Sequence, residues 1–389
     1  MKKILLFALA LSFVTVGIAQ VKQYSPKDWY STVKQKHDVK IAEQEATYTQ
    51  QINPTVSNLR AADIVIGETW YDLQSNSSVS NRIFAYEDGT IGSTWTRGMT
   101  PTAYADRGTG YNYFDGSAWG DYPTERIEDQ RTGWPTYAPY GANGEITCAH
   151  SGIDDGLIFS WRENKGEGDW SYFSLVGPAG NEDLLWPRMV TSGDNNEIIH
   201  VICITPPTAS GGTVHEDLDG ALLYSRSSDG GATWDPENLV LDGVSSDYTN
   251  GWSGDEYAWA QPVGNTLAFT AFGGIKDGVA MKSTDGGDNW ERLVYYASPM
   301  PFFENGTLIP RFGGGDGFNA AVIDDEGLVH ISFGRLIHED TDGGGPYYFP
   351  YSDGLVYWNE TMPALDSAML QADILPSDWT TMNLYQNGN

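Results

Sequence analysis

One segment of the chain, residues 104–122, combines aromatic side chains with carboxylates as a sugar-binding cleft does. Tyr111, Tyr113 and Trp119 could stack on the apolar face of a sugar ring, while a carboxylate such as Asp106 could bind hydroxyl groups or act in catalysis. The segment is too long for a plain turn, so we expect a functional loop. The alternative is a loop that packs on its own aromatic residues. The other expected ligand-binding residues, from later clusters of similar composition, are Trp252, Tyr257 and Tyr348.

Three arginines could act together on an anionic ligand. Arg188 and Arg311 follow proline in W-P-R and I-P-R contexts, and Arg131 opens a similar segment. Arginine suits this role because its planar guanidinium binds a carboxylate through two hydrogen bonds. The alternative is a set of ordinary surface arginines that pair with local acids.

The densest group of potential metal ligands lies in a Gly-rich insertion at residues 215–219. Glu216, Asp217 and Asp219 could bind Ca²⁺ through carboxylates and carbonyls, although solvated loop acids are the simpler interpretation. We expect no required cofactor. No H-E-x-x-H, phosphate-binding Gly loop or Ser-His-Asp arrangement can be argued from the spacing of residues.

Two stretches of the chain, 227–234 and 283–290, share the pattern S-x-D-x-G-x-[T/N]-W. The pattern predicts a tight hairpin turn, called here an S-x-D turn. Its Ser and Asp side chains accept hydrogen bonds from backbone N–H groups, and its glycine adopts a positive φ. The Trp is expected to be buried beneath the turn. The positions concerned are Ser227, Asp229, Gly231, Trp234, Ser283, Asp285, Gly287 and Trp290.

A longer repeat surrounds the S-x-D turns. Each unit has a first strand, an apolar second strand buried on both faces, a third strand and a turn into a fourth. Such a unit is a four-stranded antiparallel blade, and its recurrence predicts an all-β propeller. The expected units are about 61–100, 131–177, 184–243, 252–298 and 315–362, with 366–389 as the start of an incomplete sixth.

The S-x-D turns resemble the Asp boxes of sialidase-like, BNR-repeat β-propellers. That resemblance implies six blades and a binding site on the face opposite the Asp boxes. Three runs, 66–76, 107–116 and 185–190, also resemble exported Bacteroidetes propellers of the type IX secretion kind, which usually continue into a C-terminal sorting domain. The missing sixth unit and sorting domain favour a truncated chain. The alternative is that residues 21–60, an expected N-terminal arm, supply the missing strands.

The resemblance to sialidases implies three carboxylate-binding arginines, a Tyr–Glu nucleophile and an Asp acid/base. The family places its first arginine in an F/Y-R-I-P motif, which this chain lacks. The nearest match contains Arg82, which is assigned to a third strand and a structural role. Two functions therefore stay open. One is a glycan-binding propeller with exo-sialidase-type glycosidase activity, and the other is a non-catalytic adhesion or recognition propeller.

The N-terminus has the features of a cleaved secretion signal. Residues 1–20 contain two lysines, a short apolar run and small residues before the expected cleavage site. We therefore expect a secreted or cell-surface monomer that binds a glycan or glycoprotein, without membrane insertion. The formal charge of −30 argues against a nucleic acid partner, because like charges repel. Cys148 and Cys203 are expected to be unpaired, although export permits a disulfide.

Overall fold

Short β-strands make up almost all regular structure in the computed structural model, which describes residues 63–74, 77–152, 156–303, 306–343 and 354–371. The only helices in these ranges are two 3₁₀ turns, η1 (Thr208–Ser210) and η2 (Asp242–Val244), and the short helix α2 (Ser367–Gln371). No helix among these residues is long and apolar enough to cross a membrane. The predicted leader, N-terminal arm and Tyr348 lie outside the described residues.

In the part of the chain that the structure describes, the strands form five sheets, numbered 1 to 5 in chain order. Sheet 1 contains β1 (Ile83–Ala85), β2 (Ile91–Arg97) and β3 (Gly108–Phe114). Sheet 2 contains β4 (Gly133–Tyr140), β5 (Gly144–His150), β6 (Leu157–Arg162) and β7 (Ser171–Leu175). Sheet 3 contains β8 (Leu185–Ser192), β9 (Ile198–Ile204), β10 (Leu222–Ser227) and β11 (Leu239–Val240). Sheets 2 and 3 are thus four-stranded and antiparallel, as the repeat predicts.

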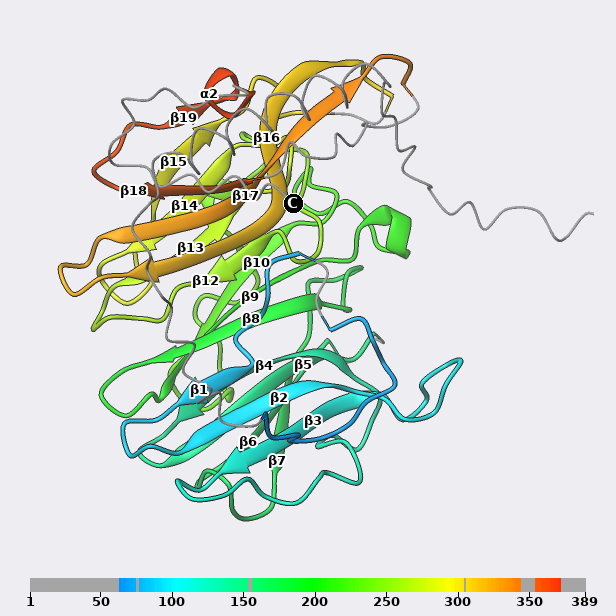
Figure 1. Ribbon diagram of the computed structural model, residues 1–389, viewed down its shortest axis with the longest axis vertical. Coiled ribbons are helices and arrows are strands. Elements are labelled where there is room, and N and C mark those ends of the chain that lie inside the picture. The colour runs from blue at the N-terminus through cyan, green and yellow to red at the C-terminus, as the bar shows by residue number, and fades with distance from the viewer. Residues whose placement is uncertain (1–62, 75–76, 153–155, 304–305, 344–353, 372–389) are drawn as a thin grey trace, which may run out of the picture.

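The last two sheets depart from this pattern. Sheet 4 contains β12 (Tyr257–Trp259), β13 (Leu267–Ala271), β14 (Gly278–Ser283) and β15 (Glu291–Ala297), and β19 (Leu365–Asp366) joins its edge in parallel. Sheet 5 contains β16 (Ile309–Ile323), β17 (Val329–Asp340) and β18 (Gly354–Asn359). Asp366 therefore ends β19 at the edge of sheet 4, and residues 367–371 form α2. This corrects the assignment of residues 366–371 to the start of a sixth sheet. Sheets 1 and 2 lie at the bottom of Figure 1 and sheets 4 and 5 at its top.

Three apolar clusters hold neighbouring sheets together. The second strand of sheet 3, β9, has a continuous apolar run because both of its faces are covered. Val201 and Cys203 face sheet 2, whereas Ile202 and Ile204 face sheet 4. A third cluster joins sheets 4 and 5. Cys148 and Cys203 lie in the first cluster and are free thiols, as expected.

The S-x-D turns make the hydrogen bonds that their sequence predicts. Ser227 accepts the N–H of Gly231 at 2.9 Å, and Asp229 accepts that of Thr233 at 2.8 Å. The turn at 283–290 repeats both contacts. Trp234 and Trp290 are half-buried rather than buried beneath their turns, because each packs its ring partly against the preceding sheet.

The first sheet differs from the predicted first unit. Gly108–Phe114 is a strand paired with β2, so residues 104–122 are not one loop. The strand carries the two ends of that segment to opposite ends of the sheet. Arg82 precedes β1, which is an outer strand of the three-stranded order β1-β2-β3 and packs against β4. Its assignment to the third strand of a unit is therefore corrected.

Candidate functional site

A buried arginine, Arg107, lies where sheets 1 and 2 meet. Its side chain is fixed by a 2.8 Å hydrogen bond from Nε to the carbonyl oxygen of Thr132. The guanidinium lies 5.4 Å from the ring centre of Tyr71 and 5.8 Å from that of Trp134. Arg107 is only 8% exposed and makes no ion pair among the described residues. A buried charge without a counter-charge is costly, which favours an anionic ligand here.

The imidazole of His150 is buried near Arg107 and two further arginines. It stacks on Trp134 with 5.5 Å between ring centres, and its Nδ1 accepts the N–H of Trp186 at 3.1 Å. Burial, and then repulsion by Arg107, Arg131 and Arg188, lowers the pKa of His150 to about 3. The three arginines therefore lie within electrostatic range of one ring. Arg131 is exposed, and its Nε donates to the carbonyl oxygen of Tyr104 at 3.0 Å.

Arg188 is part of a buried tie between sheets rather than a free ligand-binding group. It is 2% exposed and forms an ion pair with Asp255, which also accepts the indole N–H of Trp134 at 3.2 Å. Arg188 Nη2 donates to the carbonyl oxygen of Ser78 at 2.6 Å, and Asn319 donates its N–H to the Ser78 hydroxyl at 2.9 Å. These contacts join sheets 2 to 5 through the segment at Ser78.

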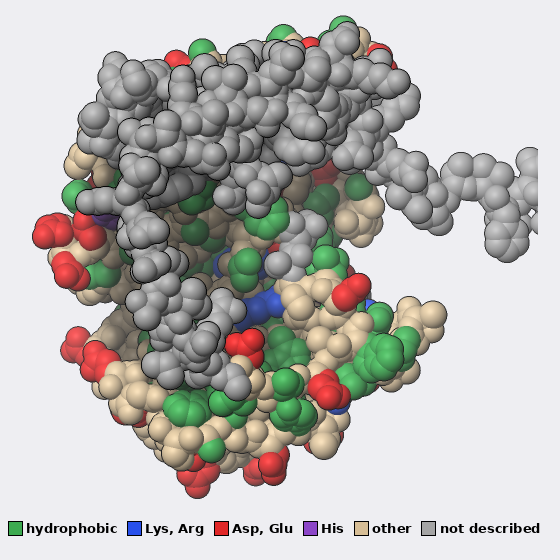
Figure 2. Space-filling view, in the orientation of Figure 1, with side chains coloured by type: hydrophobic (Ala, Val, Ile, Leu, Met, Phe, Trp, Pro, Cys, Tyr) green, Lys and Arg blue, Asp and Glu red, His purple; other side chains and the backbone are tan. Residues whose placement is uncertain are grey.

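A fourth arginine, Arg82, lies near the same tie. Its guanidinium donates to Ser80 and Gln74, and burial together with Arg188 lowers its pKa to about 10, although Asp255 opposes the shift. Arg82, Arg107, Arg131 and Arg188 lie within electrostatic range of one another or of His150, and we call this group of four side chains the arginine recess. Figure 2 shows a hollow near the middle of the molecule with Lys or Arg side chains at its bottom.

Two other predicted site residues lie outside the arginine recess. Arg311 is exposed near the start of β16, which belongs to sheet 5. Asp106 accepts the N–H groups of Met99 and Thr100 at 2.8 and 3.0 Å and contacts Arg97 at 3.9 Å. Partial burial opposes ionisation, but these backbone hydrogen bonds lower the pKa of Asp106. Its role is to hold the turn that precedes β3.

The predicted ligand-binding aromatic residues separate into two groups. Trp252 and Tyr257 belong to the core, which corrects their assignment to a binding surface. The indole N–H of Trp252 donates to the carbonyl oxygen of Val244, and the hydroxyl of Tyr257 donates to that of Trp186. Tyr111, Tyr113 and Trp119 instead line a pocket of about 360 Å³.

A buried carboxylate organises one wall of this aromatic pocket. Glu145 accepts hydrogen bonds from Tyr111 at 2.8 Å and from Arg162 Nε at 2.6 Å, and it also accepts one from Tyr137. Glu145 lies at the start of β5 and His150 at its end. The aromatic pocket and the arginine recess therefore lie at opposite ends of sheet 2 and are two separate places.

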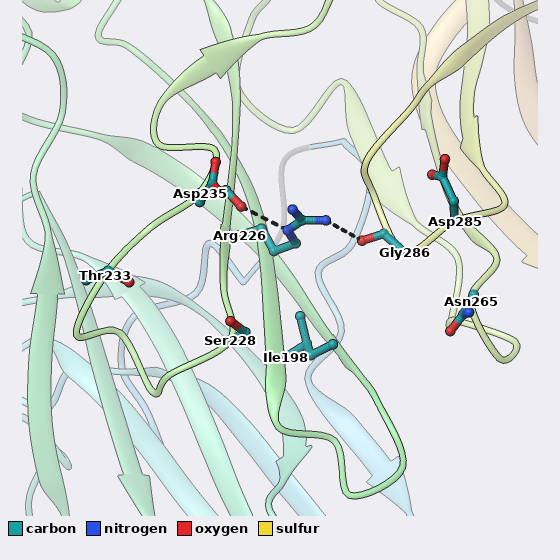
Figure 3. Close-up of a pocket in the computed structure, with 8 residues that line it drawn as sticks. All are labelled: Ile198, Arg226, Ser228, Thr233, Asp235, Asn265, Asp285 and Gly286. Atoms are coloured by element: carbon teal, nitrogen blue, oxygen red, sulfur yellow. Dashed lines mark hydrogen bonds between the residues drawn. The ribbon is translucent and has the colours of Figure 1, made fainter.

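A third hollow, of about 270 Å³, lies between the two S-x-D turns. Arg226 spans it, donating to the carbonyl oxygens of Asp235 and Gly286 at 2.9 Å each (Figure 3). It also forms an ion pair with Asp288. Because Arg226 belongs to β10 and binds Gly286 and Asp288 of the turn in sheet 4, it connects sheets 3 and 4.

The expected metal ligands do not converge. Asp219 accepts both the N–H and the hydroxyl of Thr208, at 2.6 and 2.8 Å, and thereby fixes the start of η1. Glu216 and Asp217 have positive φ values of 49° and 63° in the turn between His215 and Leu218. Within the described ranges, no group of three or more His, Cys, Asp or Glu side chains could hold a metal ion.

No family model and no curated protein matches the chain by sequence. Among solved structures, the six-bladed propeller lectin of Aleuria aurantia aligns with 81% of this chain and 83% of its own at 12% identity and a TM-score of 0.43. An α-L-arabinofuranosidase from Fusarium graminearum aligns with 83% and 95%, at 13% identity and 0.42. The Trypanosoma rangeli sialidase aligns with 72% of this chain and 47% of its own, at 15% identity and 0.39. These low scores carry no argument about function, which must come from the chain's own residues.

Proposed function

We propose that the chain is an exported β-propeller that binds an acidic glycan in the arginine recess. The single observation that supports this most is the buried guanidinium of Arg107, which makes no ion pair among the described residues. Arg131 adds an exposed guanidinium beside it. A carboxylate or sulfate on a sugar would neutralise both charges through charge-assisted hydrogen bonds.

A sugar suits the surroundings of Arg107 better than a free inorganic anion does. Tyr71, Trp134 and Trp186 lie around Arg107 and His150, and aromatic faces pack against the C–H face of a sugar ring. The proposed ligand position is the end of sheet 2 where His150 lies, in keeping with a site expected away from the S-x-D turns. The five sheets would be five blades of the proposed six-bladed ring.

Binding is a better-supported function than hydrolysis. A sialidase-type mechanism needs a tyrosine activated by a glutamate, and the structure does contain Tyr111 and Tyr137 bonded to Glu145. Burial, and then the charge of Glu145, raises the pKa of both hydroxyls, which is opposite to what a nucleophile requires. The pair also lies at the other end of sheet 2 from the arginines. We therefore favour the recognition propeller over the glycosidase.

A glycan array on the purified full chain tests the proposal. It should display sialic acid-, uronic acid- and sulfate-terminated glycans beside their uncharged counterparts. We expect acidic glycans to bind, and a fluorogenic sialoside to remain uncleaved. Turnover that Arg107→Met abolishes would support the glycosidase instead, and the absence of any acidic glycan among the bound ligands would contradict the proposal.

A further inference from the structure

The aromatic pocket between sheets 1 and 2 has the size of a small-ligand site. Its volume of about 360 Å³ falls in the range of ligand clefts. It is lined by the end of β3, by the segment that follows, and by Arg162 and Gly166 after β6. It lies at the opposite end of sheet 2 from the arginine recess, so the function proposed above does not use it.

The aromatic walls of the pocket are held in place before any ligand arrives. The ring of Tyr113 packs directly on Gly166, where a Cβ atom would lie 2.2 Å from the ring. Trp119 forms a β-bridge with Phe114 and packs against its ring with 5.7 Å between centres. Two fixed aromatic faces reduce the entropy that binding would otherwise cost.

Unused polar groups point to a ligand rich in hydroxyls. The indole N–H of Trp119, the hydroxyl of Tyr113 and the carboxylate of Asp121 have no protein hydrogen-bond partner among the described residues. Asp115 uses only Oδ1, which accepts the N–H groups of Ser117 and Ala118 at 2.7 and 2.8 Å. Its Oδ2 is left to accept from a ligand. Donors and acceptors beside an aromatic face are what sugar hydroxyls require.

The charge of the pocket excludes acidic sugars. Arg162 lines it, but Glu145 already neutralises the guanidinium through the 2.6 Å ion pair. Asp115 and Asp121 add negative charge without a basic partner in the described chain, and hydrogen bonds from Ala118 and Ser117 lower the pKa of Asp115. We infer that this pocket is a second carbohydrate site, which takes an uncharged sugar and works independently of the arginine recess.

The experiment uses the full chain and two variants of neighbouring aromatic residues. Trp119→Ala removes a wall of the pocket, whereas the control Tyr122→Ala removes an exposed ring three residues further on that does not line it. The probes are neutral oligosaccharides on an array and the methyl glycosides of glucose, galactose, mannose and fucose in titrations. Wild type and Tyr122→Ala should bind a neutral sugar equally, and Trp119→Ala should bind it at least tenfold more weakly.

A second variant keeps the test independent of folding. Asp121→Asn alters an exposed side chain and removes one acceptor, so it should weaken neutral-sugar binding while the thermal unfolding curve stays unchanged. All pocket variants should still bind acidic glycans as the wild type does, and Arg131→Ala should still bind the neutral sugar. Absence of neutral-sugar binding by the wild type, or equal binding by Trp119→Ala, would overturn the inference without touching the acidic-glycan proposal.

Discussion

At the scale of single residues, the pKa of His150 is a measurable property of the region around Arg107. The folded-state pKa of His150, about 3, lies below its ordinary value of 6.5, because burial and the three arginines disfavour the charged ring. Between these two values the unfolded chain binds more protons than the folded chain. The contribution of His150 to stability is therefore complete above about pH 6.5 and is lost as the pH falls toward 3.

This dependence can be measured by denaturant unfolding at pH 7 and pH 4.5. We expect the free energy of unfolding to fall between the two, and His150→Gln to reduce that fall, since the variant cannot take up a proton. An identical fall in wild type and His150→Gln would mean that other groups account for the acid sensitivity.

The half-burial of Trp290 sets the expected cost of removing it. Its ring packs on Tyr224 of sheet 3, with 5.1 Å between centres, but the residue as a whole is only half-buried. Trp290→Ala should therefore lower the free energy of unfolding by about 2 kcal/mol, less than the roughly 3–5 kcal/mol of a fully buried Trp. The control Trp70→Ala removes an indole that is 64% exposed and should change stability little. Equal losses in both variants would refute the packing assigned to Trp290.

At the scale of elements, the turns of one sheet hold aromatic residues of the preceding sheet. A Cβ atom on Gly231 would lie 2.3 Å from Phe173, and one on Gly287 would lie 2.3 Å from the hydroxyl of Tyr224. Tyr224 cannot easily retreat, because it is buried and hydrogen-bonded to His200 at 2.9 Å. The turns therefore both reverse the chain and join adjacent sheets.

Two adjacent glycines distinguish the cost of backbone strain from the cost of overpacking against the neighbouring sheet. Both Gly286 and Gly287 have positive φ, 73° and 94°, but a Cβ atom on Gly286 would meet nothing within 4 Å. We expect Gly286→Ala to cost about 1 kcal/mol from backbone strain alone. Gly287→Ala should cost about 3 kcal/mol, because overpacking adds to the strain. The stability of both variants can be measured by thermal unfolding. Equal losses of stability in Gly286→Ala and Gly287→Ala would contradict the contact between sheets.

Much at this scale could be predicted from the sequence. The continuous apolar run predicted β9 as a strand buried on both faces, and the repeated Ser, Asp and Gly predicted the two turns, because these signals are local. The strand β3 could not be found in the same way. Gly108, Gly110 and the polar residues Thr109 and Asn112 make it look like a loop, and it is a strand because pairing with β2 satisfies its backbone.

The candidate site was predictable only in part, for a related reason. Tyr111, Tyr113 and Trp119 are close in sequence, so their shared pocket could be anticipated. Trp252 and Tyr257 have the same composition but lie in the core, since exposure depends on tertiary packing. Arg107 immediately precedes β3, a strand that the sequence pattern did not reveal, and whether an arginine forms an ion pair is decided only in the folded chain. The W-P-R context singled out Arg188 as a candidate ligand-binding residue, but its buried ion pair with Asp255 was not foreseen.

At the scale of the whole molecule, the buried pair of Arg188 and Asp255 connects segments far apart in the chain. Removing one partner of a buried ion pair leaves a charge without compensation, which typically costs about 3–5 kcal/mol. We expect a loss of this size for Asp255→Asn in denaturant unfolding. The control Asp288→Asn breaks the more exposed pair with Arg226 and should have little effect. An equally small change in the free energy of unfolding for Asp255→Asn would show that the ion pair of Arg188 and Asp255 does not stabilise the assembly of sheets.

The binding of an acidic glycan is tested most directly by two arginines of similar exposure. Both are exposed, and Arg131 lies beside Arg107 at the junction of sheets 1 and 2, whereas Arg311 lies in β16 of sheet 5. Calorimetric titration should use one acidic methyl glycoside chosen from the array. We predict at least tenfold weaker binding by Arg131→Ala, because a charge-assisted hydrogen bond contributes about 1.5–3 kcal/mol, and unchanged binding by Arg311→Ala. Equal affinity of Arg131→Ala and wild type, or an equal loss in both variants, would contradict the arginine recess as the site.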